Sequence, residues 1–64
     1  MPNLKRLEEL LEECEQRLLQ VNDARAAELG KPLHQRRVMT LIFLEKERAV
    51  YAYAAHTLKQ VRDG

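Results

Sequence analysis

The segment Val38-Met39-Thr40-Leu41-Ile42-Phe43-Leu44, which leads into Ala49-Val50-Tyr51-Ala52-Tyr53-Ala54-Ala55, decides the fold of this 64-residue chain. Wound as an α-helix at about 100° per residue, it does not gather its apolar side chains on one stripe. One apolar face carries Val38, Leu41, Leu44, Tyr51, Ala55 and Leu58. A second face carries Ile42, Ala49, Ala52 and Tyr53, and a third carries Phe43, Val50 and Ala54. Such a helix has to be covered from more than one side. The first half of the chain can cover one side, and we expect a second copy or a partner protein to cover the other.

The first half of the chain has the pattern of a helix that packs along one seam. Steps of three and four residues alternate along its apolar positions, as in a heptad repeat, through Leu4, Leu7, Leu11, Cys14, Leu18 and Val21. Asn3 is a good N-cap residue, and Glu13 stands four residues before Arg17, a spacing that favours an ion pair. Asn22-Asp23 could interrupt the helix, but the alanines that follow favour one continuous helix over 3–29.

Gly30-Lys31-Pro32 is the clearest break between two helical segments. Glycine suits the left-handed position that follows a helix, and proline suits the first turn of the next one. The sequence therefore predicts a single domain over 1–64, with a helix over 3–29, a turn over 30–32 and a helix over 32–62. The predicted fold is all-α, an antiparallel two-helix hairpin. Because so short a chain hides little apolar surface alone, we expect it to form a homodimeric four-helix bundle.

Composition excludes several classes of protein. The single cysteine, Cys14, cannot form an internal disulfide, and the formal charge of +1 gives the whole chain little attraction for nucleic acid or membranes. No secretion signal and no apolar run of about 20 residues is present, so we expect a cytoplasmic protein outside the membrane. The chain has no Glu-x-x-His pair for a di-iron site and no glycine loop for phosphate. We therefore expect no enzyme, no metal and no cofactor.

Two groups of residues are candidates for binding. Alanines on the second helix would let another helix approach closely, and aromatic residues would anchor it. The predicted partner or dimer interface consists of Leu41, Ile42, Phe43, Ala49, Val50, Ala52, Tyr53, Ala54 and His56. The second group is a basic cluster around the turn that could contact an anion or nucleic acid, namely Arg25, Lys31, His34, Arg36 and Arg37.

The basic cluster has two other interpretations. It could be an ordinary solvated end of the hairpin, since no aromatic residue there offers a surface for stacking bases. It could also meet the acidic first helix of an antiparallel copy. Residues 1–15 carry two basic and five acidic side chains, whereas residues 16–37 carry five basic and two acidic ones.

Scattered residues on both helices resemble a known family of small hairpins. Arg6-Leu7, Leu11, Glu13-Cys14 and Leu18, followed by Phe43-Leu44, Leu58 and Gln60, are similar to the PscE/YscE co-chaperones of type III secretion. The resemblance implies a helical hairpin that pairs with a larger chaperone to hold the needle subunit. This chain departs from the family in the longer connection between the matched segments and in lacking Tyr-Gln after Gly30-Lys31-Pro32. In size and shape the chain is also similar to the ROP-type plasmid RNA-binding proteins, although no motif carries over.

These observations favour a protein–protein interaction or adaptor module that self-associates or binds partner helices, with a type III secretion co-chaperone as a special case. The alternative is a ROP-like dimeric regulator that binds nucleic acid through the basic turn region.

Overall fold

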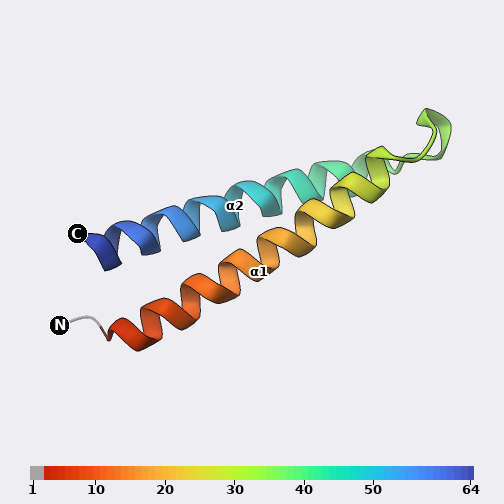
Figure 1. Ribbon diagram of the computed structural model, residues 1–64. Coiled ribbons are helices and arrows are strands. Elements are labelled where there is room, and N and C mark those ends of the chain that lie inside the picture. The colour runs from red at the N-terminus through yellow and green to blue at the C-terminus, as the bar shows by residue number, and fades with distance from the viewer. Residues whose placement is uncertain (1–2) are drawn as a thin grey trace.

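The computed structural model describes residues 3–64 and confirms the predicted all-α hairpin. Two α-helices, α1 (Leu4–Leu29) and α2 (Val38–Asp63), pack against each other through a connection that contains one short 3-10 helix, η1 (Leu33–Gln35). The helices run antiparallel, so the start of α1 and the end of α2 lie at the same end of the molecule (Figure 1). Its dimensions are 52 × 14 × 13 Å, which makes it a rod.

α1 begins where its capping residue predicts. The Oδ1 atom of Asn3 accepts a hydrogen bond from the backbone N–H of Arg6 at 3.2 Å. The helix continues through Asn22-Asp23 without a break and ends at Leu29, as the alanines after that dipeptide favour. The prediction of one continuous first helix is confirmed.

The connection differs from the prediction in two respects. Gly30 has φ −74° and is right-handed, so no left-handed glycine ends α1. Pro32 has ψ 148°, which is extended, and α2 begins at Val38 rather than at Pro32. A single 3-10 turn and two extended residues, Arg36 and Arg37, occupy the interval. This longer path carries the chain across the roughly 8 to 10 Å between packed helix axes.

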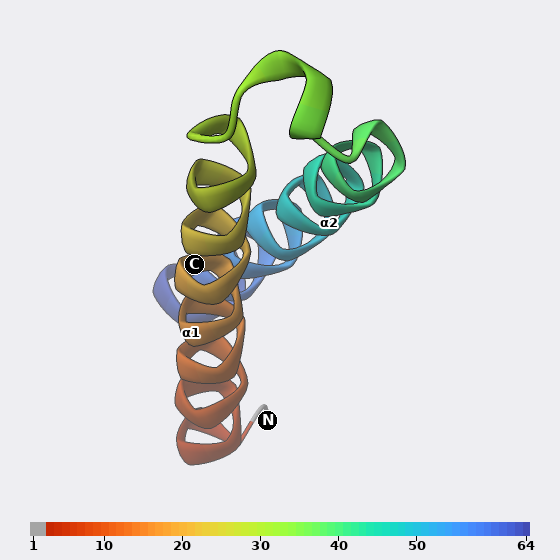
Figure 2. The same cartoon turned by 90° about the vertical axis from the view of Figure 1, so that its right-hand side faces the viewer.

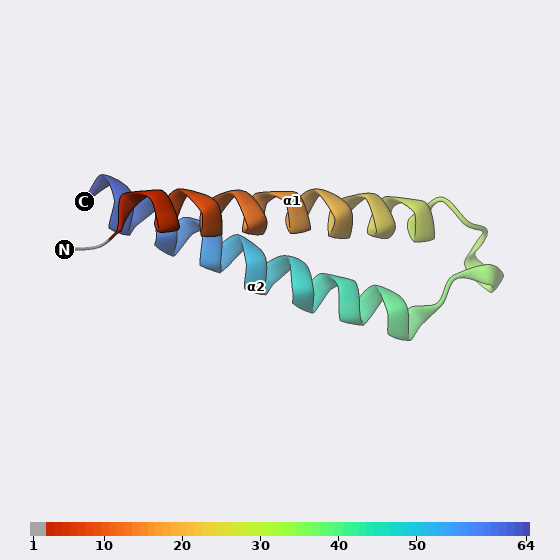
Figure 3. The ribbon, with the colours of Figure 1, turned by 90° about the horizontal axis from the view of Figure 1, so that it is seen from below.

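The interior of the hairpin is thin. Within residues 3–64, its buried apolar side chains are Leu11, Val21, Leu44 and Ala55. Half-buried residues extend this seam, with Leu7, Leu10, Cys14 and Leu18 from α1 facing Leu41, Tyr51 and Leu58 from α2. The helices cross at an angle, so contact is confined to one face of each (Figures 2 and 3). Within residues 3–64, no helical stretch has the apolar character over enough length to cross a bilayer.

Candidate interaction surface

The face of α2 that points away from α1 is apolar. The members of this outer stripe are Met39, Ile42, Phe43, Val50, Tyr53 and Val61, with Lys46 and Ala49 between them, and all are exposed. At about 100° per residue, Tyr53 lies opposite Leu44 and Ala55, the residues buried against α1, while Phe43 and Val50 lie about 100° to 140° around the helix from them. Phe43 is 61% exposed, Val50 63% and Tyr53 73%. The first helix therefore covers one side of α2 and leaves an apolar side open.

A hollow of about 340 Å³ lies beside the outer stripe and is lined by Phe43, Lys46, Glu47, Val50 and Tyr51. Four of these residues have the spacing i, i+3, i+4 and i+7, which is the diamond that receives a side chain in knobs-into-holes packing. A second hollow, of about 550 Å³, lies at the end of α2 and is lined by His56, Lys59, Gln60, Asp63 and Gly64. The residues around it are polar or charged apart from Gly64. Phe43, Val50 and Tyr51 line the first hollow, which is therefore the better match for an apolar side chain from another helix.

The predicted interface residues divide into two groups. Those that lie exposed on α2 are Ile42, Phe43, Ala49, Val50, Tyr53 and His56. Leu41, Ala52 and Ala54 are half-buried and lie at the border of the contact with α1. The prediction omitted Met39, Lys46 and Val61. The signal for the first two was present, because positions 39, 43, 46, 50 and 53 follow alternating steps of four and three.

The outer face of α1 has the opposite character. Polar and charged side chains are exposed along it, among them Lys5, Glu9, Glu12, Glu13, Gln16, Gln20 and Asp23. Leu19 is an isolated exposed leucine, 65% exposed, among these polar neighbours. Single exposed apolar residues are normal on a protein surface, whereas a continuous stripe indicates a contact surface. Only α2 has such a stripe within the part of the chain that the structure describes.

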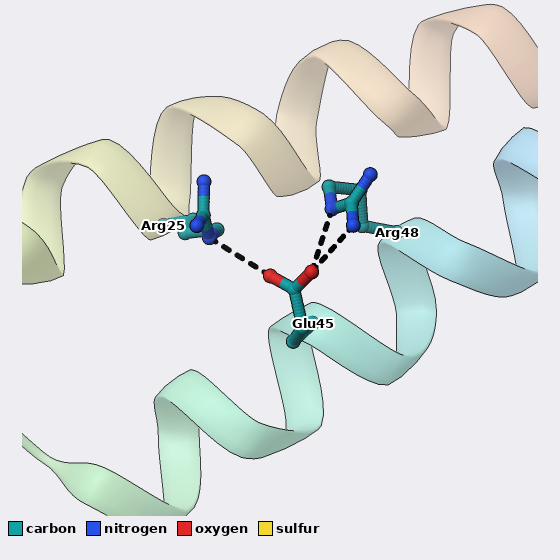
Figure 4. A network of polar contacts seen from close by, with 3 residues as sticks. All are labelled: Arg25, Glu45 and Arg48. Carbon is teal, nitrogen blue, oxygen red and sulfur yellow. Dashed lines mark hydrogen bonds and ion pairs between the residues drawn. The ribbon is translucent and has the colours of Figure 1, made fainter.

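Three ion pairs join the two helices. They link Arg17 to Glu47 at 3.0 Å, Arg25 to Glu45 at 2.9 Å, and Lys59 to Glu15 at 3.4 Å. Glu45 also accepts a hydrogen bond from the Nε atom of Arg48 at 3.0 Å (Figure 4). The pKa of Glu45 is lowered, first by the bond from Arg48 and then by the charges of Arg48 and Arg25. Exposed pairs of this kind stabilise little, so burial along the seam contributes more than these pairs do to holding the helices together.

Most of the basic cluster at the turn is occupied within the chain. Arg25 pairs with Glu45, and the Nζ atom of Lys31 lies 2.8 Å from a carboxylate oxygen of Glu28. Arg36 donates from Nε to the carbonyl oxygen of Lys31 at 2.9 Å and from Nη2 to that of Leu29 at 2.8 Å. The second bond satisfies the carbonyl group of the last residue of α1, and the first satisfies one in the connection that follows it. His34 and Arg37 are the exposed members of the cluster.

Glu28 is the residue around which the turn is built. Its side chain is 8% exposed, and its Oε1 atom accepts a hydrogen bond at 2.5 Å from the backbone N–H of Arg37, the residue that precedes α2. Because Glu28 belongs to α1, its carboxylate caps the positive N-terminal end of α2 from the neighbouring helix. The bond from Lys31 is the largest cause of the lowered pKa of Glu28, followed by the bond from Arg37, while burial opposes both.

We expect Glu28→Gln to lower the melting temperature clearly at about pH 7, since the ionised carboxylate is the form that the turn binds. A carboxylate whose pKa is lowered on folding stabilises above its ordinary value of 4.5 and loses that effect as the pH falls through the lowered value. The difference from the unmodified chain should therefore shrink at about pH 2.5. Circular dichroism melts measure this, with Glu13→Gln on the exposed face of α1 as the control. Equal effects of both substitutions at about pH 7 would refute the capping role.

Within residues 3–64, no three side chains of histidine, cysteine, aspartate or glutamate cluster as metal ligands. Cys14 is a free, half-buried cysteine in the seam between the helices, where it packs as a small apolar residue. The outer stripe of α2 is thus the feature of the described chain best suited to binding. No protein-family model, curated protein or solved structure matches this chain.

Proposed function

We propose that this chain is a helical interaction module that works by pairing the outer stripe of α2 with another helix. The observation that carries the proposal is the row of exposed apolar residues on α2 from Met39 to Tyr53, interrupted by Lys46, on the side that α1 leaves uncovered. An amphipathic or apolar helix face of this kind is bound by a second helix through residues spaced by three and four. Exposure of the same row to water would favour association with any helix of matching shape.

The composition of the outer stripe fits protein recognition. Phe43 and Tyr53 are large side chains with few rotatable bonds, and such aromatic residues dominate binding energy at interfaces. Ala49 lies between them and lets another backbone approach closely. In a co-chaperone of type III secretion, this stripe would meet the helices of the larger chaperone. With a free thiol in its seam, we place the module in the cytoplasm.

The alternative, a ROP-like nucleic-acid binder, has less support from the contacts at the turn. Arg25, Lys31 and Arg36 already bind groups of the same chain. Redirecting these side chains to phosphate would break the bonds that order the turn. His34 and Arg37 would then have to carry the binding, and no aromatic residue accompanies them for stacking.

One pair of substitutions separates the two functions. We expect Tyr53→Asp to abolish the complexes that the purified chain forms with itself or with proteins of its host, because it places a charge in an apolar contact. Arg37→Glu changes a charge at the rim of the stripe and should weaken those complexes far less than Tyr53→Asp does. Mass photometry or cross-linking measures the complexes, and a filter assay with RNA and DNA at low salt measures the alternative. Salt-dependent nucleic-acid binding that Arg37→Glu weakens, together with complexes unaffected by Tyr53→Asp, would reverse the assignment.

A further inference from the structure

We infer that the outer stripe is covered by α2 of a second copy of this chain, which runs antiparallel with a two-fold axis close to Val50. This inference rests on the proposed function and names its partner and geometry. Four observations support it: the area left exposed, the centre of the stripe, the placement of charge, and the shape of the hollow beside Phe43.

The chain exposes more surface than a compact monomer of its mass, and the excess is close to the area that one interface would bury. A compact monomer of 7.5 kDa is expected to expose about 4,200 Å². This chain exposes 5103 Å², an excess of about 900 Å² over that expectation. A standard protein interface buries about 800 Å² on each partner. The radius of gyration, 14.8 Å, likewise exceeds the roughly 10.7 Å expected for a compact domain of this length. Pairing two rods side by side removes the excess area, and it brings the radius of gyration closer to the roughly 14 Å expected for a compact domain of twice this length.

The ends of the outer stripe are symmetric about Val50. Met39 and Val61, its first and last apolar members, stand eleven residues on either side of this position. An antiparallel pair of helices centred there brings Met39 of each copy beside Val61 of the other. It covers every member of the stripe in both copies. The small side chain of Ala49 lies next to the axis, where the two helices approach most closely.

Charge favours the antiparallel direction over the parallel one. A parallel pair in register would set Lys46 against its own counterpart inside an apolar contact. In the antiparallel pair about Val50, the two Lys46 side chains are separated by about 12 Å along the axis. Arg37 of one copy then lies beside Asp63 and the negative end of α2 of the other. The same end carries the acidic start of α1, where five of the first fifteen residues are glutamate.

The hollow beside Phe43 lies where the same pairing delivers an aromatic side chain. Its four diamond positions, Phe43, Lys46, Glu47 and Val50, are centred between positions 46 and 47. The two-fold axis near Val50 carries that centre to Tyr53 of the second copy. A tyrosine knob would fill the hollow, with the Lys46 ammonium group beside its ring. The two-fold axis repeats this contact, so Tyr53 of each copy enters the hollow of the other copy.

Disulfide trapping tests the axis directly in the full chain carrying Cys14→Ala. Val50→Cys should cross-link to its own copy, because the axis brings both positions together. Met39→Cys and Val61→Cys should each cross-link poorly alone, since each lies about 33 Å from its counterpart along the axis. When Met39→Cys and Val61→Cys chains are mixed, with one of them tagged, a disulfide should join one chain of each kind. We expect Val50→Cys to react at least about tenfold faster than Met39→Cys alone, through its higher effective concentration. Circular dichroism checks that each variant is folded.

Each other outcome overturns the inference in a recognisable way. Equal self-cross-linking of all three single-cysteine variants indicates a parallel pair. The control is the Cys14→Ala chain with Gln16→Cys, a substitution on the exposed face of α1. If none of the three variants cross-links faster than this control and the protein has a monomeric mass, there is no second copy. In that case the interaction function still stands if Tyr53→Asp abolishes a complex with a host protein. If Tyr53→Asp changes no complex either, both the inference and the proposed function fail.

Discussion

Truncating Leu44 to alanine is expected to destabilise the folded chain by about 2 to 4 kcal/mol, the usual cost of removing a buried leucine side chain. Leu44 is one of only four buried apolar residues among residues 3–64. A chain of this length has a total stability of about 3 to 10 kcal/mol, so this loss is a large part of the whole. The melting temperature should fall by about 10 to 25 °C.

Leu19→Ala is the matched control for this prediction. The chemical change is identical, but Leu19 is 65% exposed on the polar side of α1. Its truncation should change the stability by no more than about 0.5 kcal/mol. Thermal and urea melts followed by circular dichroism measure both variants. Similar melting temperatures for Leu44→Ala and Leu19→Ala would mean that the seam between α1 and α2 is not the core of the folded protein.

Val50→Glu is expected to weaken self-association at least about 100-fold, which corresponds to about 2.7 kcal/mol or more. The substitution puts two carboxylates beside the two-fold axis, in a contact that excludes water. Within a single hairpin, by contrast, Val50 is 63% exposed and contributes little to the seam with α1. Val50→Glu should therefore weaken association strongly, while the chain retains its helical content at high protein concentration.

Leu19→Glu controls for the general effect of placing glutamate on an exposed apolar position. Leu19 and Val50 are exposed to nearly the same extent, 65% and 63%, but they lie on the outer faces of different helices. Only the face that another copy covers should respond to the charge. Analytical ultracentrifugation of both variants measures the dissociation constants. If Leu19→Glu dissociates the protein as strongly as Val50→Glu, the contact is on α1 and the outer stripe is not the interface.

Both helices could be predicted from the sequence because their signals are local. The heptad spacing of α1 and the capping group of Asn3 act within a few residues of each other. The excess of apolar faces on α2 could also be predicted, since it depends only on residue type and helical rotation. The same reasoning predicts Phe43, Val50 and Tyr53 as interface residues, and all three lie exposed on α2.

The turn could not be predicted in the same way because its bonds join residues from different elements. Glu28 interrupts the apolar seam in the sequence, and its role as the cap of α2 emerges only once Arg37 is brought to it. The sequence suggests that Arg36 is part of a basic surface, whereas its side chain binds the carbonyl oxygens of Leu29, the last residue of α1, and of Lys31 in the connection. Arg17 was predicted to pair with Glu13, but it pairs with Glu47 across the hairpin. Each outcome depends on tertiary contacts that helical spacing does not contain.

We propose that a single hairpin leaves too much of α2 uncovered to be stable as a monomer. Sedimentation equilibrium of the untagged chain over micromolar concentrations measures this most directly. We expect a mass of twice the 7.5 kDa of one chain, with dissociation only on dilution. A helical, cooperatively folded protein that stays at 7.5 kDa throughout that range would contradict the claim.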